Sequence, residues 1–246
     1  MSAAPKSGFG PGPRSRVKRL GKRALYDREA VYGVLDAGLL CHVAYVIGSQ
    51  PYVTPTAYWR QDDRLFWHGS SKSRMLMHLA PGAPVCLNVS LLDGLVLARS
   101  GFEHTVNYRS VTAYGVARAV TDEAEKHAAV LAFMERLWPG RWDEVRPPSR
   151  QEMKATTVVV MTIEEAAAKI RGGPPEDKPA DLGLPCWAGV LPMTTIMGAP
   201  EPDPGLKSRK ARPGYLKDWP QGAAVDSILR ELAKRQRLTG RRRRST

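Results

Sequence analysis

Several signatures of well-known reaction sites are missing from this 246-residue chain. It has no Gly-x4-Gly-Lys-Ser/Thr loop, no His-Glu-x-x-His zinc motif and no Gly-x-Ser-x-Gly nucleophile elbow. The glycine-rich stretch from Gly8 to Gly12 follows no predicted strand, so it is not a dinucleotide fingerprint. These absences argue against triphosphate hydrolysis, zinc catalysis and covalent hydrolysis, and we expect no metal site.

Cysteine and long apolar runs are also scarce. The three cysteines, Cys41, Cys86 and Cys186, form no Cys-x-x-Cys pair, and an odd, widely spaced set does not predict a disulfide framework. We therefore expect a reducing cytoplasm as the location. No run of about 20 apolar residues is present, and the N-terminus lacks the apolar stretch of a secretory signal, so we expect no membrane association.

The formal net charge of +13 is concentrated at the two ends of the chain. Residues 1–24 carry seven Lys or Arg and no acid, and residues 201–246 carry thirteen against five acids. We predict a basic flexible segment (1–24), one folded domain (25–200) and a basic, largely disordered tail (201–246). The tail ends in Arg241–Arg244, which would attract nucleic acid non-specifically, but no recognition motif accompanies it.

Most of the predicted elements between the two tails are strands. β-prone runs are interrupted by short helices with clear caps, including Asp122 with Glu125 and Ser149 with Glu152. Asp93-Gly94 carries a hairpin signal, and Gly115 marks a bulge or bend. The expected strands lie at 39–48, 51–59, 65–67, 84–92, 95–98, 108–120 and 156–163. The expected helices lie at 28–38, 71–80, 123–137 and 223–237. This order predicts a mainly antiparallel β-barrel of the α+β class with a few peripheral helices.

Residues 70–74, Ser-Ser-Lys-Ser-Arg, stand where a strand gives way to a helix. Hydroxyl groups, free backbone N–H groups and two cations would meet there. Cations in a first helical turn are mildly unfavourable unless an anion is present. The segment therefore predicts a site for a phosphate monoester, although Ser, Lys and Arg are also ordinary residues of a solvated helix face. In the same way, core packing is the simpler explanation for any single aromatic or histidine side chain.

Several motifs in one order resemble a known family. They include Gln50–Tyr58, Leu65–Ser70 with Ser73-Arg74, Asn107–Val111 and Trp187-Ala-Gly189. Together they resemble the FMN-binding split-barrel superfamily of the pyridoxamine 5'-phosphate oxidases, and within it the nitroimidazole-resistance (Nim-type) branch. The resemblance covers about residues 16–195. It implies a split β-barrel and a homodimer with FMN at the interface between two subunits.

The resemblance also implies roles for individual residues. Ser73 and Arg74, with Lys72 beside them, match the group that grips the FMN phosphate. The strand that lies along the flavin ring corresponds to Thr54, Pro55, Thr56, Ala57 and Tyr58. Trp67 and His68 match the neighbouring strand end, Ser110 a polar flavin contact, and Trp187 an aromatic side chain from the partner subunit. His68 matches a histidine implicated in catalysis in Nim-type proteins, where it would donate a proton to the reduced acceptor.

The chain departs from the true oxidases after the Trp-x-Gly motif. Residues 190–197 are uncharged, so a second phosphate would have little to hold it, which argues against oxidation of vitamin B6. The resemblance instead implies an FMN-dependent oxidoreductase that takes electrons from a reduced nicotinamide or deazaflavin and passes them to a small organic acceptor of the nitro-compound or quinone type. An alternative is a non-catalytic flavin- or haem-binding protein of the same fold, with His42, His68 or His104 as iron ligands.

Overall fold

The computed structural model describes residues 8–206 and 213–243 and contains one large antiparallel sheet. Its strands follow the order β1-β8-β6-β7-β4-β3-β2-β5-β9, and β5 also pairs with β6. That extra pairing closes six of the strands into a barrel. The strands are β1 (Ala24–Leu25), β2 (Leu40–Ile47), β3 (Gln50–Gln61), β4 (Arg64–Ser70), β5 (Ala83–Leu97), β6 (Thr105–Ala119), β7 (Thr156–Thr162), β8 (Glu165–Arg171) and β9 (Gly189–Pro192).

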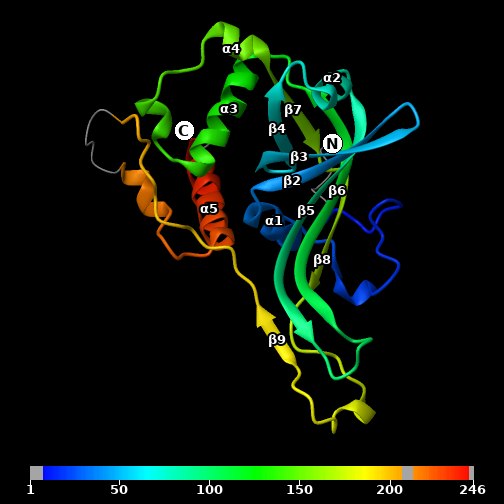
Figure 1. Ribbon diagram of the computed structural model, residues 1–246. Coiled ribbons are helices and arrows are strands. Elements are labelled where there is room, and N and C mark those ends of the chain that lie inside the picture. Colours follow the sequence, from blue (N-terminus) through cyan, green and yellow to red (C-terminus); the bar gives the residue numbers. More distant parts are fainter. Residues whose placement is uncertain (1–7, 207–212, 244–246) are drawn as a thin grey trace.

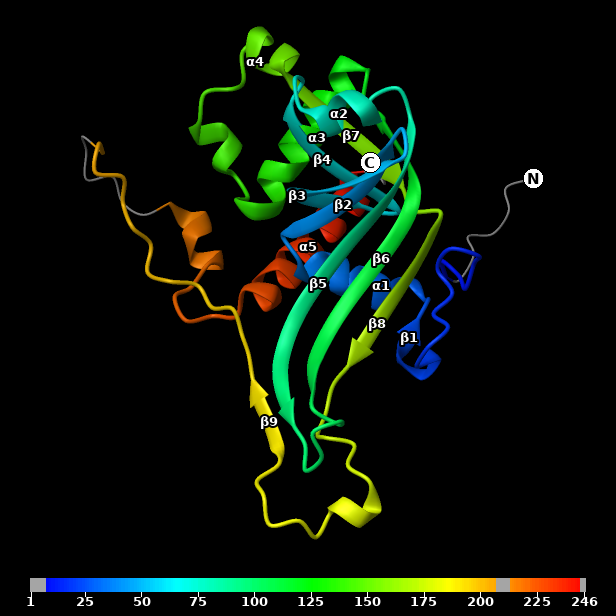
Figure 2. The same cartoon turned by 45° about the vertical axis from the view of Figure 1, so that its right-hand side comes forward.

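The described residues form five α-helices outside the barrel, on one side and at one end of it: α1 (Arg28–Ala37), α2 (Arg74–Leu79), α3 (Glu123–Leu137), α4 (Arg150–Ala155) and α5 (Val225–Arg243). Figure 1 shows α2 and α4 at one end of the molecule, while β5 and β6 run to the opposite end and meet β9 there. Figure 2 shows the same arrangement from another side. No helix in the described residues has the length and apolar character needed to cross a lipid bilayer.

The caps predicted from the sequence begin three of the helices. Asp27 accepts a hydrogen bond from the backbone N–H of Ala30 (2.8 Å), and Asp122 accepts one from Glu125 (2.7 Å). Ser149 and Glu152 form a complete capping box at the start of α4. Local side-chain to backbone bonds of this kind need no tertiary partner, so they can be predicted from short sequence patterns.

Alternation along β3 and β4 creates two hydrophobic cores. Tyr58 pairs with Trp67, and both side chains lie inside the barrel. Trp59 pairs with Phe66, and both rings face outwards and are covered by α3. Because consecutive strand residues point to opposite faces, one register fills both cores.

Two strand predictions were wrong. Asp93-Gly94 is not a hairpin turn, because β5 runs through it with a register shift between Leu92 and Gly94. The Asp93 carboxylate binds the guanidinium of Arg109 on β6, and Gly94 pairs with Pro192 on β9. At Gly115, in contrast, the register between β5 and β6 does not shift, so the predicted bulge is absent. A Cβ there would lie 2.3 Å from the carbonyl oxygen of Thr162, so glycine permits close approach of the chains.

Both predicted tails contribute to the folded body where the structure describes them. Phe9 is only 5% exposed and lies in the barrel core, while the Arg14 side chain binds Glu164 and Glu165. In the C-terminal region, Leu229 and Leu232 of α5 are buried, and α5 packs against α1. The structure thus differs from the expectation of flexible ends for residues 8–24 and for α5. Residues 1–7, 207–212 and 244–246, which include Arg244, lie outside the described residues.

A buried cluster of charges ties the helices to the barrel. Asp36 of α1 binds Arg60 of β3 through two hydrogen bonds of 3.0 and 2.6 Å. Arg136 of α3 donates to the backbone carbonyls of Asp36 and Gly38, and Arg237 of α5 also pairs with the Asp36 carboxylate. Buried ion pairs need several hydrogen bonds to offset their desolvation, and this cluster supplies them. The same bonds connect α1, β3, α3 and α5 at Asp36.

Candidate functional site

The loop from Ser70 to Arg74 joins β4 to α2 and is held by backbone bonds. The N–H of Ser71 donates to the carbonyl of Ala155 at the end of α4 (2.8 Å), and the N–H of Ser73 donates to Ser70 (2.9 Å). Gly69 precedes the loop, and a Cβ there would come within 3.1 Å of the Leu76 side chain. The loop is therefore fixed in place while the side chains of Lys72 and Arg74 are exposed.

Three side chains of this loop, those of Lys72, Ser73 and Arg74, have no capping or carboxylate partner among the described residues. Ser73 occupies the N-cap position of α2, yet its hydroxyl makes no capping bond within the described residues. Across the same residues neither Lys72 nor Arg74 forms an ion pair, and the Arg74 guanidinium instead lies 4.6 Å from the centre of the Tyr52 ring. A hydroxyl, two cations and free N–H groups without a carboxylate partner form a suitable setting for a phosphate.

Residues 54–58 lie on β3, and their side chains divide between the two faces of the sheet. The Thr54 hydroxyl lies 3.3 Å from that of Tyr45 on the inner face, and Thr56 is half-buried beside Cys41. Pro55 is exposed on the outer face, and Ala57 is half-buried. This segment can offer its backbone and Pro55 to a ligand on the outer face.

Tyr58 and Trp67 have no accessible side-chain surface. The Tyr58 hydroxyl donates to the backbone carbonyl of Leu35, and burial raises the pKa of this phenol. The indole nitrogen of Trp67 is buried without a hydrogen-bond partner among the described residues. Both side chains thus lie in the core, and a cofactor on the outer face could meet only the backbone of these residues, which is the contact that the resemblance implies for residues 54–58.

His68 lies on the face of β4 that α3 covers. Its ring packs against Trp59 (5.8 Å between centres) and edge-on against Phe133 (5.3 Å). Its Nδ1 atom is buried and has no hydrogen-bond partner in the part of the chain that the structure describes. Burial lowers the pKa of this imidazole, so His68 is neutral at pH 7.

Ser110 belongs to a polar stripe on the outer face of β5 and β6 that the sequence did not reveal. Ser110 pairs with Ser90, and its hydroxyl donates to the carbonyl of Lys169 (3.3 Å). Beside it, the Asn88 amide donates to Thr112 (3.1 Å) and accepts from the Ser90 hydroxyl (2.9 Å). The alternation of Asn88 and Ser90 with the buried Leu87 and Val89 was the signal that could have shown this stripe.

Trp187 lies far from the Ser70–Arg74 loop. It lies two residues before the start of β9, which Figures 1 and 2 show at the opposite end of the molecule from α2. The indole is 64% exposed and lies over Gly189, where a Cβ would be 2.8 Å from the ring. This close approach explains the spacing of the Trp-x-Gly motif. One chain alone does not bring Trp187 to the loop.

Comparison with known families identifies the fold. The family described as pyridoxamine 5'-phosphate oxidase matches residues 27–170. This chain belongs to that family. The pyridoxamine 5'-phosphate oxidase-like superfamily predicted from the motifs is confirmed, as is the α+β split barrel. No curated protein matches the chain.

Two solved structures of this fold are similar over nearly their whole length. The flavocytochrome Anf3 from Azotobacter vinelandii is 42% identical, with 87% of this chain and 100% of that chain covered and a TM-score of 0.82. A protein from Mycobacterium smegmatis described as binding FAD and haem is 34% identical, with 82% and 98% covered and a TM-score of 0.77. Both matches cover more of the chain than residues 27–170 alone.

A third structure comes from the nitroimidazole-resistance branch. It is a candidate 5-nitroimidazole antibiotic resistance protein from Bacteroides thetaiotaomicron, 18% identical, with 60% of this chain and 86% of that chain covered and a TM-score of 0.47.

Proposed function

We propose that this protein is a flavin-binding redox protein that also holds haem. The observation that carries the proposal is the similarity, over almost their entire chains, to two proteins named for flavin and haem. At 42% and 34% identity, these relatives extend beyond the part that the family model matches. The arrangement of the Ser70–Arg74 loop supports the flavin part of the proposal independently.

The phosphate of the flavin would be held by Lys72, Ser73 and Arg74. These residues fit the group because the Ser73 hydroxyl is not used as a cap and neither cation has a carboxylate partner among the described residues. Hydrogen bonds from charged donors to phosphate are stronger than neutral ones, and a guanidinium can bind two oxygens at once. FMN, which the sequence predicted, satisfies this loop, and so does the same phosphate within FAD.

A second copy of the chain would complete the pocket. Trp187 is exposed at the opposite end of the molecule from the loop, so a site containing both needs two chains. The outer sheet face supports this arrangement, since Leu40, Val46 and Val53 are all about half or more exposed there. Apolar strand faces of this kind commonly mark protein interfaces. We therefore propose a homodimer in which the outer face of one chain and Trp187 of the other enclose the ring.

A bound flavin would supply the redox chemistry, since it accepts a hydride and can release electrons singly. The chain would orient the ring through the backbone of residues 54–57 and the polar stripe that contains Ser110. His68 is proposed as the residue that delivers a proton to the reduced acceptor. Burial favours the neutral imidazole, so His68 would first have to take up that proton. The donor would be a reduced nicotinamide or deazaflavin, and the acceptor a small organic molecule such as a nitro compound or quinone.

A haem group needs an imidazole that is neutral and held in place. Among the three histidines considered as iron ligands, His42 and His104 are exposed, whereas the His68 ring is held between Trp59 and Phe133. His68 fits this requirement best, but an imidazole bound to iron could not also transfer a proton at the flavin, so the two roles are alternatives. Loss of the Soret band in His68→Gln would assign His68 to haem, and an unchanged Soret band would leave His68 the proton-transfer role. The three free cysteines also fit a reducing cytoplasm, where we propose that the protein works.

The proposal is tested by the absorption spectrum of the purified chain and mass identification of what copurifies. We expect flavin bands and a Soret band, and reduction of the flavin bands by a reduced nicotinamide or deazaflavin. A colourless protein that gains no flavin absorbance when FMN or FAD is added would refute the proposal. Flavin bands without a Soret band, even after addition of haem, would remove the haem part alone.

A further inference from the structure

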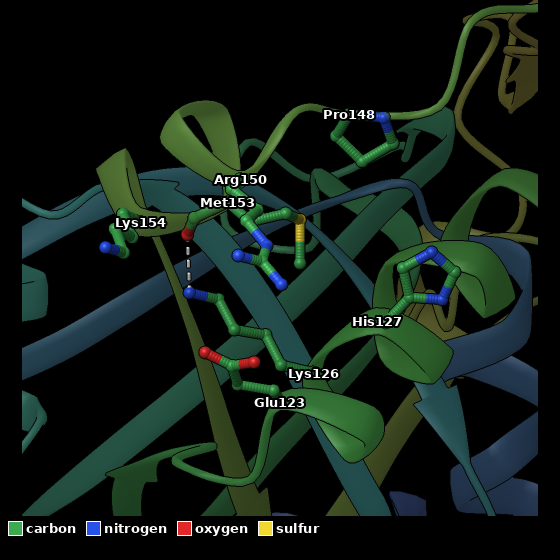
Figure 3. Close-up of a pocket in the computed structure, with 7 residues that line it drawn as sticks. All are labelled: Glu123, Lys126, His127, Pro148, Arg150, Met153 and Lys154. Carbon is green, nitrogen blue, oxygen red and sulfur yellow. Dashed lines mark hydrogen bonds between the residues drawn. The ribbon is translucent and has the colours of Figure 1, made fainter.

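A cleft of about 450 Å³ lies between α3 and the segment that leads into and includes α4. Three cations line it: Lys126 comes from α3, and Arg150 and Lys154 come from α4 (Figure 3). A volume of this size is within the range of sites for small molecules. Residues 70–74 are not among those that line it, so the cleft is separate from the loop described above.

The charges that line this cleft are unbalanced. Among the residues that the structure describes, none of the three cations forms an ion pair, and Glu123 is the one acidic residue of the lining. Neighbouring charges of one sign repel each other unless a counter-ion lies between them. Three cations and one carboxylate leave two positive charges, so a ligand with two negative charges would neutralise the cleft.

A second cleft, of about 320 Å³, is balanced by the chain itself. Its lining includes Arg235, which lies 2.7 Å from the Asp218 carboxylate and 3.6 Å from that of Glu231. Arg150 and Lys154 in the first cleft have no such carboxylate within residues 8–206 and 213–243. The first cleft is therefore suited to an anion from outside the chain, and the second provides a matched control.

Contacts between side chains hold the walls of the first cleft in position. The Lys126 ammonium group donates to the backbone carbonyl of Met153 (2.6 Å), which joins α3 to α4, as the dashed line in Figure 3 shows. The His127 ring packs at right angles to Trp142, with 5.4 Å between the ring centres. Burial lowers the pKa of Lys126, and an anion beside it would favour its charged form. Walls that are already in place lose less conformational freedom when a ligand binds.

The apolar part of the lining indicates an organic ligand. Pro148 and Met153 lie among the cations, and both are half-buried. The carbon skeleton of a small organic anion would cover their remaining surface, which favours binding, whereas a bare inorganic ion would leave it in water.

We propose that this cleft binds a small organic anion with two negative charges, either a phosphate monoester or a dicarboxylate. Arg150 can bind two oxygen atoms of the anion at once, while Lys126 and Lys154 contribute point charges. The carbon skeleton lies against Pro148 and Met153. Because the ligand contacts both α3 and α4, it strengthens the link that Lys126 makes between them. The site does not depend on flavin binding elsewhere in the chain.

The test is isothermal titration calorimetry of the full-length protein as purified, at constant ionic strength. The probes are glycerol 3-phosphate, succinate and, as a control with one charge, acetate. At least one of the two dianions is expected to bind with a Kd below about 1 mM, and acetate at least tenfold more weakly. Arg150→Gln/Lys154→Gln should weaken dianion binding at least tenfold. Lys217→Gln/Arg235→Gln, in the second cleft, removes the same two charges and should stay within about twofold of the wild type.

Each outcome decides for or against the proposal. Binding of either dianion that is lost in the first double variant alone supports it, and the tighter probe assigns the phosphate ester or the dicarboxylate. Failure of both dianions to bind, or equal losses in the two double variants, would overturn it. A loss in Arg74→Ala with full affinity in Arg150→Gln/Lys154→Gln would place the anion at the Ser70–Arg74 loop and would also overturn it.

Thermal unfolding without ligand checks that the double variant is folded. Its midpoint should lie within about 2 °C of the wild type, because both side chains are exposed and make no ion pair among the described residues. If the midpoint falls further, Lys154→Gln alone serves as the test. This single variant should weaken dianion binding at least threefold, and an unchanged affinity would overturn the proposal.

Discussion

Helices α2 and α4 lie at the same end of the molecule and begin with the same two residues, yet they use them differently. Both have six residues, with Ser73-Arg74 at the start of α2 and Ser149-Arg150 at the start of α4. In α4, Ser149 and Glu152 bond to each other's backbone N–H groups, and Arg146 binds the Glu152 carboxylate. In α2, the position equivalent to Glu152 is Leu76, which offers no acceptor. One acidic residue three positions after the cap separates a self-contained helix start from one that is open to an anion.

The largest expected effect is a loss of FMN affinity on replacing Arg74 but not on replacing Arg150. Arg74→Ala should weaken FMN binding by more than tenfold, since charged hydrogen bonds to phosphate contribute about 1.5–3 kcal/mol. Arg150→Ala is the matched variant and should leave FMN affinity within about twofold, because Arg150 lines the cleft between α3 and α4 and not the loop. Fluorescence titration of flavin-free protein measures both. Equal losses in the two variants would mean that the helix starts are not functionally different.

The strand that precedes α2 also has an unsatisfied group, because the Nδ1 atom of His68 on β4 has no hydrogen-bond partner among the residues that the structure describes. Because burial lowers its pKa in the folded chain, the unfolded chain binds more protons as the pH falls below about 6.5, and stability falls with it. His68→Phe should remove this loss, which is at most about 1.4 kcal/mol per pH unit for one proton. Urea unfolding of flavin-free protein between pH 5 and 7 measures the slope. An unchanged slope in the variant would show that another group takes up the proton.

The two capping serines should differ in stability. Ser149→Ala should destabilise the flavin-free protein by about 1 kcal/mol, the usual result of losing a capping hydroxyl. Ser73→Ala should change the stability far less, because Ser73 makes no capping bond among the described residues. It should weaken flavin binding several-fold instead. Urea unfolding of both variants decides this, and a loss of about 1 kcal/mol in Ser73→Ala would show that Ser73 does cap α2 in solution.

The smallest expected effect concerns Glu152 of α4, the acidic residue for which α2 has no equivalent. The Arg146 guanidinium and the Ser149 cap lower the pKa of Glu152 to about 2. The stabilisation of α4 should therefore be complete above about pH 4.5 and decline as the pH falls towards 2. The amide NMR signals of Ser149 and Glu152 should follow this titration, and those of Ser73 and Leu76 should not. A Glu152 midpoint near 4.5 would mean that the capping box is not formed in solution.

Local patterns in the sequence predicted the helix starts at Asp27, Asp122 and Ser149, because each cap involves residues only three positions apart. The order and extent of the strands were harder to predict from the sequence. The turn signal of Asp93-Gly94 is overridden by Arg109 and Pro192, which lie 16 and about 100 residues further along the chain. Burial of Phe9 was hidden by its glycine- and proline-rich surroundings, since nothing local shows that the barrel core needs its ring.

In the candidate site, too, residues close together in the sequence could be predicted, and contacts between distant segments could not. Lys72, Ser73 and Arg74 could be named from the sequence because they are consecutive and lie at a strand-to-helix junction. The cleft of Lys126, Arg150 and Lys154 could not, because its walls come from α3 and α4 and meet only in the folded chain. The inward direction of Tyr58 and Trp67 depends on the register between β3 and β4, which a motif match does not reveal.

The charge cluster at Asp36 has a consequence for the order of assembly. Asp36 and Arg60 are 24 residues apart, so this pair can form soon after the second and third strands emerge during synthesis. Arg237 is 201 residues from Asp36, so its contact must wait until almost the whole chain has been made. The C-terminal helix therefore docks onto a carboxylate that already has a partner. Truncation before α5 should leave the barrel's own ion pair intact while uncovering the surface of α1 against which α5 packs.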